Sequence, residues 1–352
     1  MSKYWSERVK LLEPYVPGEQ PKDKKYIKLN TNENPYPPSP KVLDAIIKSA
    51  DESLRLYPDP DCIELRKAIS SYYKLNEKQV FPGNGSDELL AFSFMAFFNP
   101  GDPILFPDIT YSFYPVYCSM FNIDYKLIPL DKELSIPIDR FFAKNGGIIF
   151  PNPNAPTGKY LPVEAIRNIL EHNCDNVVIV DEAYIDFGGD SVIGLIDEYP
   201  NLLIIQTFSK SRSLAGLRLG FALGNENLID ALNMIKNSIN SYTIDRLAIK
   251  AGIEAIKDED YFQTTKRRII STRERVTEAL KNMGFRVVDS KANFIFITHP
   301  DKEAEWLFIS LKEKGVLVRY FKKPGIDNFL RVSIGSEEEM EVFLTIIQGL
   351  VL

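Results

Sequence analysis

The sequence has few of the residues that build metal centres and disulfide frameworks. Its 352 residues include only three cysteines and two histidines. Cys62, Cys118 and Cys174 show no metal-binding spacing and leave an odd count, which is typical of a reducing compartment. His172 and His299 are too few for a histidine-based metal site, and neither has a nucleophile motif nearby. We therefore expect a cytoplasmic protein without a bound metal, with both histidines at the surface.

Long apolar runs and an excess of positive charge are also missing. No apolar stretch reaches the length of a membrane span, and the first residues lack the apolar core of a signal peptide. The net charge is −6 and no basic stripe stands out, which argues against a nucleic-acid partner. The composition is that of an ordinary globular protein, with 45% hydrophobic and 26% charged residues. Small-molecule anions would have to be held by a few local arginines.

The pattern of apolar residues divides the chain into three parts. An N-terminal arm, 1–35, is polar and proline-rich, and its first thirty residues are expected to be extended rather than helical. In 36–245, strand-like runs alternate with helical patterns, as in a parallel sheet covered on both faces. A charged linking helix and a small α+β domain are expected in 246–352. The fold class is therefore α/β, with a large and a small domain sharing a cleft, and part of 36–75 on the side of the small domain or of a dimer contact.

Individual elements can be placed from the same pattern. Ser39-Pro40 is typical of a helix start, with a capping hydroxyl followed by a first-turn proline. Another helix is expected over 111–121. The expected strands of the large domain are 104–106, 125–128, 148–150, 177–180, 202–206 and 219–223, and those of the small domain are 285–288, 294–298, 316–319 and 330–333.

The stretch Thr207-Phe208-Ser209-Lys210, with Arg218 eight residues later, offers an amine beside hydroxyls and a fixed positive charge. These groups suit a carbonyl cofactor that also carries a phosphate. The Lys210 amine can form a Schiff base, and Arg218 with Ser209 can hold phosphate oxygens. The alternative is a solvated lysine that simply follows a core strand.

Asp181 follows the apolar run Val177–Val180, so its carboxylate is expected to be buried and to need a partner. A protonated pyridine nitrogen would provide one, in a hydrogen bond of about 1.5–3 kcal/mol. That contact would keep the ring an electron sink. Tyr184, three residues later, could reach a phenolic oxygen on the same ring. The alternative is a structural pair between Asp181 and an arginine or lysine.

Three further groups have both a functional and a structural interpretation. Gly85, Ser86 and Asp87 lie where a strand ends and a helix begins, a place that favours a phosphate, although Ser86 or Asp87 could merely cap the helix. Tyr111 could stack on a planar ring or fill space in the core. Arg319 and Arg331, at two strand ends of the small domain, could bind anions or form structural salt bridges.

Taken together, these residues resemble the fold type I pyridoxal-phosphate (PLP) aminotransferases, also called class II, and within them the histidinol-phosphate aminotransferase family. The resemblance covers nearly the whole chain. It implies a large domain with a mostly parallel seven-stranded sheet and PLP as the cofactor. Its motifs are Leu12–Tyr15, Asn30–Pro35, Arg55–Pro58, Gly85–Glu88, Pro156–Gly158, Asp181–Tyr184, Ser209-Lys210, Gly216–Arg218 and Leu330–Val332.

The resemblance implies a role for each matching residue. Lys210 would be the Schiff-base lysine and proton shuttle, Asp181 would bind the pyridine nitrogen, and Tyr184 would bind the ring oxygen. Tyr111 would stack on the ring. The remaining roles fall into two groups: a phosphate set of Gly85, Ser86, Asp87, Ser209, Arg218 and, from the neighbouring subunit of a homodimer, Tyr57; and a substrate set of Tyr15, Asn32, Arg319 and Arg331.

One position departs from the family pattern. The family usually has asparagine immediately before Pro-Thr-Gly, where it contacts the ring oxygen and a substrate carboxylate. Here that position is Ala155, and Asn154 stands one residue earlier. Either Asn154 reaches the ring oxygen by a local shift or Tyr184 holds it alone.

The activity that the resemblance implies is transamination of L-histidinol phosphate with 2-oxoglutarate, giving imidazole-acetol phosphate and L-glutamate in histidine biosynthesis. Three alternatives share the fold. A threonine-phosphate decarboxylase would release carbon dioxide, and an aromatic amino-acid aminotransferase would turn over phenylalanine comparably. A ligand-binding protein without activity is disfavoured because Lys210, Asp181, Tyr184 and Arg218 are all retained.

Overall fold

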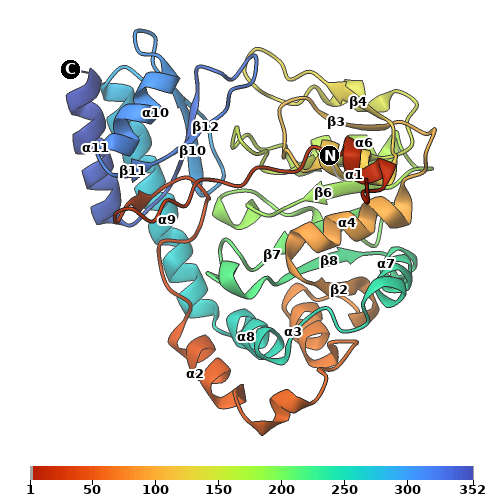
Figure 1. The fold of residues 1–352 in the computed structure, drawn as a ribbon. Coiled ribbons are helices and arrows are strands. Elements are labelled where there is room, and N and C mark those ends of the chain that lie inside the picture. Colours follow the sequence, from red (N-terminus) through yellow and green to blue (C-terminus); the bar gives the residue numbers. More distant parts are fainter. Residues whose placement is uncertain (1–2, 352) are drawn as a thin grey trace.

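The computed structural model describes residues 3–351, in which a seven-stranded sheet forms the centre of the larger part (Figure 1). The strand order is β2-β8-β7-β6-β5-β3-β4. All strands are parallel except β8, which runs antiparallel to both β2 and β7. The strands are β2 (Val80–Gly83), β3 (Ile104–Pro107), β4 (Tyr125–Ile128), β5 (Ile148–Pro151), β6 (Val178–Asp181), β7 (Leu202–Thr207) and β8 (Gly220–Gly224). The expected mostly parallel sheet is confirmed.

Helices cover both faces of this sheet because its central strands are apolar on both sides. In β6, Val178 and Val180 belong to one core cluster and Ile179 to the other. The first cluster includes side chains of α3 (Ile63–Tyr73), α6 (Val163–Glu171) and α8 (Arg246–Lys257). The second includes those of α4 (Gly85–Phe97), α5 (Tyr114–Phe121) and α7 (Glu226–Ile239). α2 (Pro40–Ser49) packs on α8, with Ser39 accepting the capping bond expected of it.

The smaller part is built on an antiparallel sheet of order β12-β13-β10-β9. Its strands are β9 (Arg286–Val288), β10 (Phe294–Thr298), β12 (Arg319–Tyr320) and β13 (Leu330–Ser333). α9 (Glu259–Asn282), α10 (Ala304–Glu313) and α11 (Glu337–Val351) contribute to its separate core. The N-terminal segment joins this part through β1 (Ile27–Lys28), which pairs in parallel with β11 (Val316–Leu317). The arm is therefore attached beside the small sheet.

Four expectations are corrected by the structure. The arm is not wholly extended, because Ser6 caps a short helix, α1 (Glu7–Leu11). The expected strand 316–319 is split into β11 and β12, which belong to different sheets. α5 starts three residues after the expected start, which leaves Tyr111 in the preceding turn. His299 is buried against the ring of Phe285 rather than exposed.

The linking region passes between the two parts, and α8 packs on α2 and α3 in the core of the large sheet. We therefore propose that the boundary between the large and small domains lies between α8 and α9 rather than at residue 245. No helix within residues 3–351 is long and apolar enough to cross a membrane.

Candidate active site

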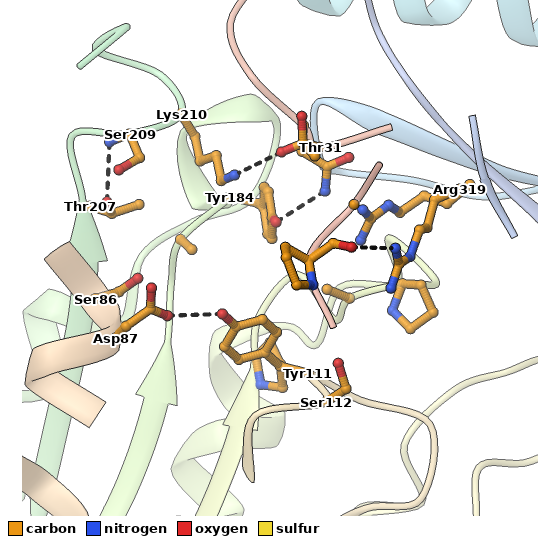
Figure 2. Close-up of a pocket in the computed structure, with 18 of the residues that line it drawn as sticks. Thr31, Ser86, Asp87, Tyr111, Ser112, Tyr184, Thr207, Ser209, Lys210 and Arg319 are labelled. Carbon is orange, nitrogen blue, oxygen red and sulfur yellow. Dashed lines mark hydrogen bonds between the residues drawn. The ribbon is translucent and has the colours of Figure 1, made fainter. Parts of the chain in front are cut away.

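A cavity lies at the carboxyl ends of the parallel strands, where the large sheet, the small sheet and the N-terminal segment meet. Figure 2 shows Ser86, Asp87 and Ser209 on one side, Arg319 on the other, and Tyr184 between them. Of the fourteen predicted site residues, twelve line this cavity: Tyr15, Asn32, Ser86, Asp87, Tyr111, Asp181, Tyr184, Ser209, Lys210, Arg218, Arg319 and Arg331. Gly85 is not part of the lining but lies against the side chain of Arg218, and Tyr57 lies outside the cavity.

Lys210 follows β7, and its side chain extends into the cavity (Figure 2). Its Nζ donates to the carbonyl of Thr31 at 3.2 Å and lies 5.7 Å from the centroid of the Tyr184 ring. The amide of Asn34 donates to the carbonyl of Lys210 at 3.0 Å, so the N-terminal segment holds this residue from both its main chain and its side chain. The amine has no carboxylate partner among the ion pairs of residues 3–351, which leaves it available to a ligand.

Asp181 is the last residue of β6 and is only 5% exposed. Its carboxylate accepts from the backbone N–H of Ala183 at 3.1 Å and from the Tyr114 hydroxyl at 3.4 Å. Burial raises the pKa of Asp181 to about 6. No arginine or lysine within residues 3–351 forms an ion pair with it, so the structural-pair alternative fails. A buried acid that faces a cavity without a cation suits a protonated ring nitrogen.

The opposite wall of the cavity is a candidate phosphate cradle at the start of α4. Gly85 has φ +76°, and a Cβ added there would lie 2.7 Å from Nη2 of Arg218, so this turn needs glycine. The helix is preceded by Asn84, which makes no side-chain capping bond. Ser86 and Asp87 lie inside the helix, so the alternative that either of them caps it is wrong. Its first N–H groups and Arg218 together favour an anion.

Asp87 connects the cradle to Tyr111. Its carboxylate accepts from the Tyr111 hydroxyl at 2.8 Å and from Nη2 of Arg218 at 3.2 Å. Burial, followed by the charge of Asp87, raises the pKa of Tyr111 well above its usual value. The Tyr111 ring is thereby fixed at the cavity wall, where a planar ligand can stack on it.

The far end of the cavity carries two arginines. Arg331, on β13, donates from Nη2 to the carbonyl of Asn30 at 3.0 Å, while its buried Nε has no partner. Burial lowers the pKa of Arg331, and no acid within residues 3–351 pairs with it. Arg319, on β12, donates to the carbonyls of Val16 and Pro17 at 3.1 and 3.3 Å. A partly buried guanidinium that faces a cavity and has no acid partner is suited to bind an anionic ligand.

Asn154 and Tyr57 both lie away from the cavity. Asn154 does not line the cavity: its amide donates to the carbonyl of Ile109 at 3.0 Å and to Thr157 at 3.1 Å. Ala155 lines the cavity and brings no polar side-chain atom. Tyr57 is 77% exposed and stacks on Tyr242 with ring centroids 4.5 Å apart, away from the cavity of its own chain.

Sequence reasoning missed three residues of the site. Thr31 and Asn34 hold Lys210, and they belong to the Asn30–Pro35 run that pattern alone marks as a turn. Tyr114 reaches Asp181 from α5, and nothing in its neighbourhood distinguishes it from a core aromatic. The Tyr114 hydroxyl can be identified as a partner of Asp181 only from the three-dimensional arrangement of β6 and α5.

The chain belongs to the aminotransferase class I and II family, which matches residues 24–347. Curated relatives named histidinol-phosphate aminotransferase include one from Clostridium acetobutylicum, 61% identical over 98% of both chains. Another, from Clostridium botulinum, is 60% identical over 100% of this chain and 99% of the relative. A solved histidinol-phosphate aminotransferase from Clostridium acetobutylicum is 28% identical and covers 92% of this chain and 98% of its own, with TM-score 0.86.

The same fold occurs in a solved histidinol-phosphate aminotransferase from Sinorhizobium meliloti in complex with pyridoxal-5'-phosphate. It is 20% identical, covers 99% of both chains and has TM-score 0.88. The donor set of the present cavity fits this cofactor. It offers a free amine at Lys210, an unpaired buried acid at Asp181 and a cradle for an anion at the start of α4.

Proposed function

We propose that the protein is a PLP-dependent aminotransferase that transfers an amino group from L-histidinol phosphate to 2-oxoglutarate, giving imidazole-acetol phosphate and L-glutamate. The observation that carries this proposal is the pair of anion sites at opposite ends of one cavity. The cradle at α4 suits the phosphate of the cofactor. Arg331 and Arg319 suit an anionic group on the substrate, with the Lys210 amine between the two ends. The level of identity to relatives named for this activity supports the same conclusion.

PLP, when bound, supplies an aldehyde that condenses with amines and a ring that withdraws electrons from the substrate Cα. The side chains of the protein would bind and orient the cofactor and control its protonation. Asp181 keeps the ring nitrogen protonated, because the buried carboxylate is most stable beside a cation. Tyr184 would donate to the ring oxygen, and Tyr111 would stack on the ring. The phosphate would be held by the backbone N–H groups of Ser86 and Asp87 at the start of α4, together with Ser209 and Arg218.

Lys210 moves the proton. With PLP bound, its amine would be the group that takes up and returns the proton of the substrate Cα. The Thr31 carbonyl, 3.2 Å from Nζ, is placed to hold this amine when it is not covalently joined to PLP. Tyr15, whose ring stacks on Phe113 at 4.6 Å, closes the cavity beside Tyr111 and completes the substrate set with Asn32, Arg319 and Arg331.

The substrate assignment is tested by a coupled assay that measures glutamate formed from 2-oxoglutarate. Histidinol phosphate, histidinol without its phosphate, and phenylalanine are compared as amino donors. We expect kcat/KM for histidinol phosphate to exceed that for histidinol by at least about 100-fold, because an arginine bound to a phosphate contributes roughly 3 kcal/mol. Comparable turnover of phenylalanine would instead identify an aromatic amino-acid aminotransferase, and release of carbon dioxide a decarboxylase.

We also propose that the protein is a cytoplasmic homodimer in which Tyr57 reaches the phosphate cradle of the partner subunit. Tyr57 is exposed and stacks on the exposed Tyr242. Other large exposed apolar side chains lie near Tyr57 in sequence or on α7: Leu54, Leu56, Ile63, Met234 and Ile239. Such a surface is typical of an interface between copies.

Subunit complementation tests this arrangement. Lys210→Ala chains and Tyr57→Ala chains are each expected to have little activity alone. When the two are unfolded and refolded together in equal amounts, half of the dimers carry one intact site, so activity recovers to about a quarter of wild type. Recovery of none, with dimers present, would show that Tyr57 serves the site of its own chain, and full activity of Tyr57→Ala chains alone would show that it serves no site.

A further inference from the structure

A row of three polar side chains joins the small sheet to Tyr184. The hydroxyl of Ser333, on β13, donates to Oδ1 of Asn32 at 2.9 Å, and Nδ2 of Asn32 donates to the Tyr184 hydroxyl at 3.0 Å. Asn32 and Ser333 are only 1% and 2% exposed. These bonds involve neither Lys210 nor Asp181, and they connect Tyr184 to Ser333, which has no role described above.

The direction of donation along the row is determined by a fourth hydrogen bond. The Ser333 oxygen accepts from the backbone N–H of Asn32 at 2.8 Å, so the single proton of the Ser333 hydroxyl is directed to Oδ1 of Asn32. The amide nitrogen of Asn32 must then face Tyr184. The Tyr184 oxygen accepts that N–H, and no acceptor within residues 3–351 takes the proton of its own hydroxyl. That proton is free for a group in the cavity.

Asn32 is held so that it cannot easily turn. Its φ is +56°, in the left-handed region that asparagine tolerates better than most residues, and its carbonyl accepts from Nδ2 of Asn293 at 3.0 Å. Beside Tyr184, Ala155 brings no polar side-chain atom and Asn154 is turned away. Neither residue 154 nor residue 155 therefore offers a second side-chain donor beside the hydroxyl of Tyr184.

We propose that Asn32 and Ser333 are positioning residues that fix the Tyr184 hydroxyl as a donor to the ring oxygen of PLP. The inference rests on the proposed role of Tyr184. Each donor in the row polarises the next, which strengthens the final bond to the ring oxygen. Because Ser333 lies on β13 of the small sheet and Tyr184 follows β6 of the large one, the position of the small sheet relative to the large one would affect the bond to the cofactor.

The test is a spectrophotometric pH titration of the PLP-loaded protein without substrate. Donation to the ring oxygen favours its anionic form, so loss of donation makes the cofactor keep its proton to higher pH. We expect Tyr184→Phe to raise the midpoint of the visible absorbance change by about one pH unit, as loss of one hydrogen bond implies. Asn32→Gly, which suits the positive φ, and Ser333→Ala should each raise it by about half a unit. Asn30→Ala, a neighbouring buried asparagine that bonds to the Glu19 carbonyl, serves as the control and should leave it unchanged.

The decisive comparison is the double variant. In the Tyr184→Phe background, Asn32→Gly and Ser333→Ala should shift the midpoint no further. Unshifted midpoints in both single variants, or shifts that persist without the Tyr184 hydroxyl, would overturn the inference while leaving the proposed function intact. If Tyr184→Phe itself leaves the midpoint unchanged, the role of Tyr184 is wrong and the inference falls with it.

Discussion

Replacing Asp181 with asparagine should stabilise the PLP-free protein while impairing the loaded enzyme. Burial raises the pKa of this carboxyl from its ordinary value of 3.8 to about 6. The folded state therefore binds a proton between about pH 4 and pH 6 that the unfolded state has released, and above pH 6 the ionised group costs free energy of folding. At 1.36 kcal/mol per pKa unit, a shift of about two units corresponds to about 3 kcal/mol.

The assay is urea unfolding of PLP-free wild type and Asp181→Asn at fixed protein concentration, at pH 8 and pH 5. Asparagine keeps the size of the side chain and a hydrogen bond with Tyr114 but has no charge to bury. The variant should be more stable by about 3 kcal/mol at pH 8 and by about half as much at pH 5, with no difference below about pH 4. A variant that is equally or less stable than wild type at pH 8, or a gain that does not change with pH, would refute the reasoning.

Glu182→Gln is the matched control, since Glu182 is also buried and its pKa is raised to about 7. Its carboxylate, however, accepts from Ser191, from the backbone of Val192 and from the Gln206 amide, at 2.6, 2.9 and 2.8 Å. A glutamine side chain cannot accept all three bonds. The same loss of charge should therefore give less stabilisation than at Asp181, or none. With PLP bound, Asp181→Asn should lower kcat by about 10- to 100-fold, since the charged hydrogen bond to the ring nitrogen is lost.

Three further predictions concern the two anion sites. Gly85→Ala should weaken PLP binding by about 10-fold or more in a fluorescence titration, because of its positive φ and the close approach of Arg218; Gly216→Ala, with open space around it, should bind PLP normally. Tyr111→Phe keeps the ring but loses the bond to Asp87, and should weaken PLP binding about 3- to 10-fold in the same titration. Arg331→Met should raise the melting temperature of the PLP-free protein by about 2 °C, since a partly buried guanidinium without an ionic partner within residues 3–351 is removed, yet abolish saturation by histidinol phosphate in the coupled assay.

The positions of most strands could be predicted closely, because a strand in a covered sheet is marked by a local run of apolar residues. β4, β10 and β13 have the expected bounds. β3, β5 and β7 end one residue later than expected, β6 and β8 are shifted by one residue, and β2 is not among the expected strands. Their runs of buried Ile, Val and Leu suit only a sheet covered on both faces. The carboxyl ends of these strands then bring Asp181 and Lys210 together, so much of the site could be predicted as well.

The errors arose where the structure depends on contacts distant in sequence. β11 and β12 follow each other with only Val318 between them, so residues 316–319 have the pattern of one strand, yet β11 pairs with β1 and β12 pairs with β13. His299 is polar, but the ring of Phe285 and the backbone N–H of Asp301 give it a buried place. The bonds of Thr31, Asn32 and Asn34 join segments more than 150 residues apart. No local pattern could specify them.

The same long-range contacts explain how the cavity keeps two unpaired charges of opposite sign. Asp181 is buried in the large sheet, Arg331 is partly buried in the small one with its Nε fully buried, and neither has an ionic partner within residues 3–351. If the two paired with each other, each would be stabilised and the site would be lost. Because separate sheets hold them, each keeps a free-energy cost that only a bound ligand removes: a cationic ring for Asp181 and an anion for Arg331. Stability and binding are therefore opposed at these two positions, and substitutions that neutralise either charge should improve the first at the expense of the second.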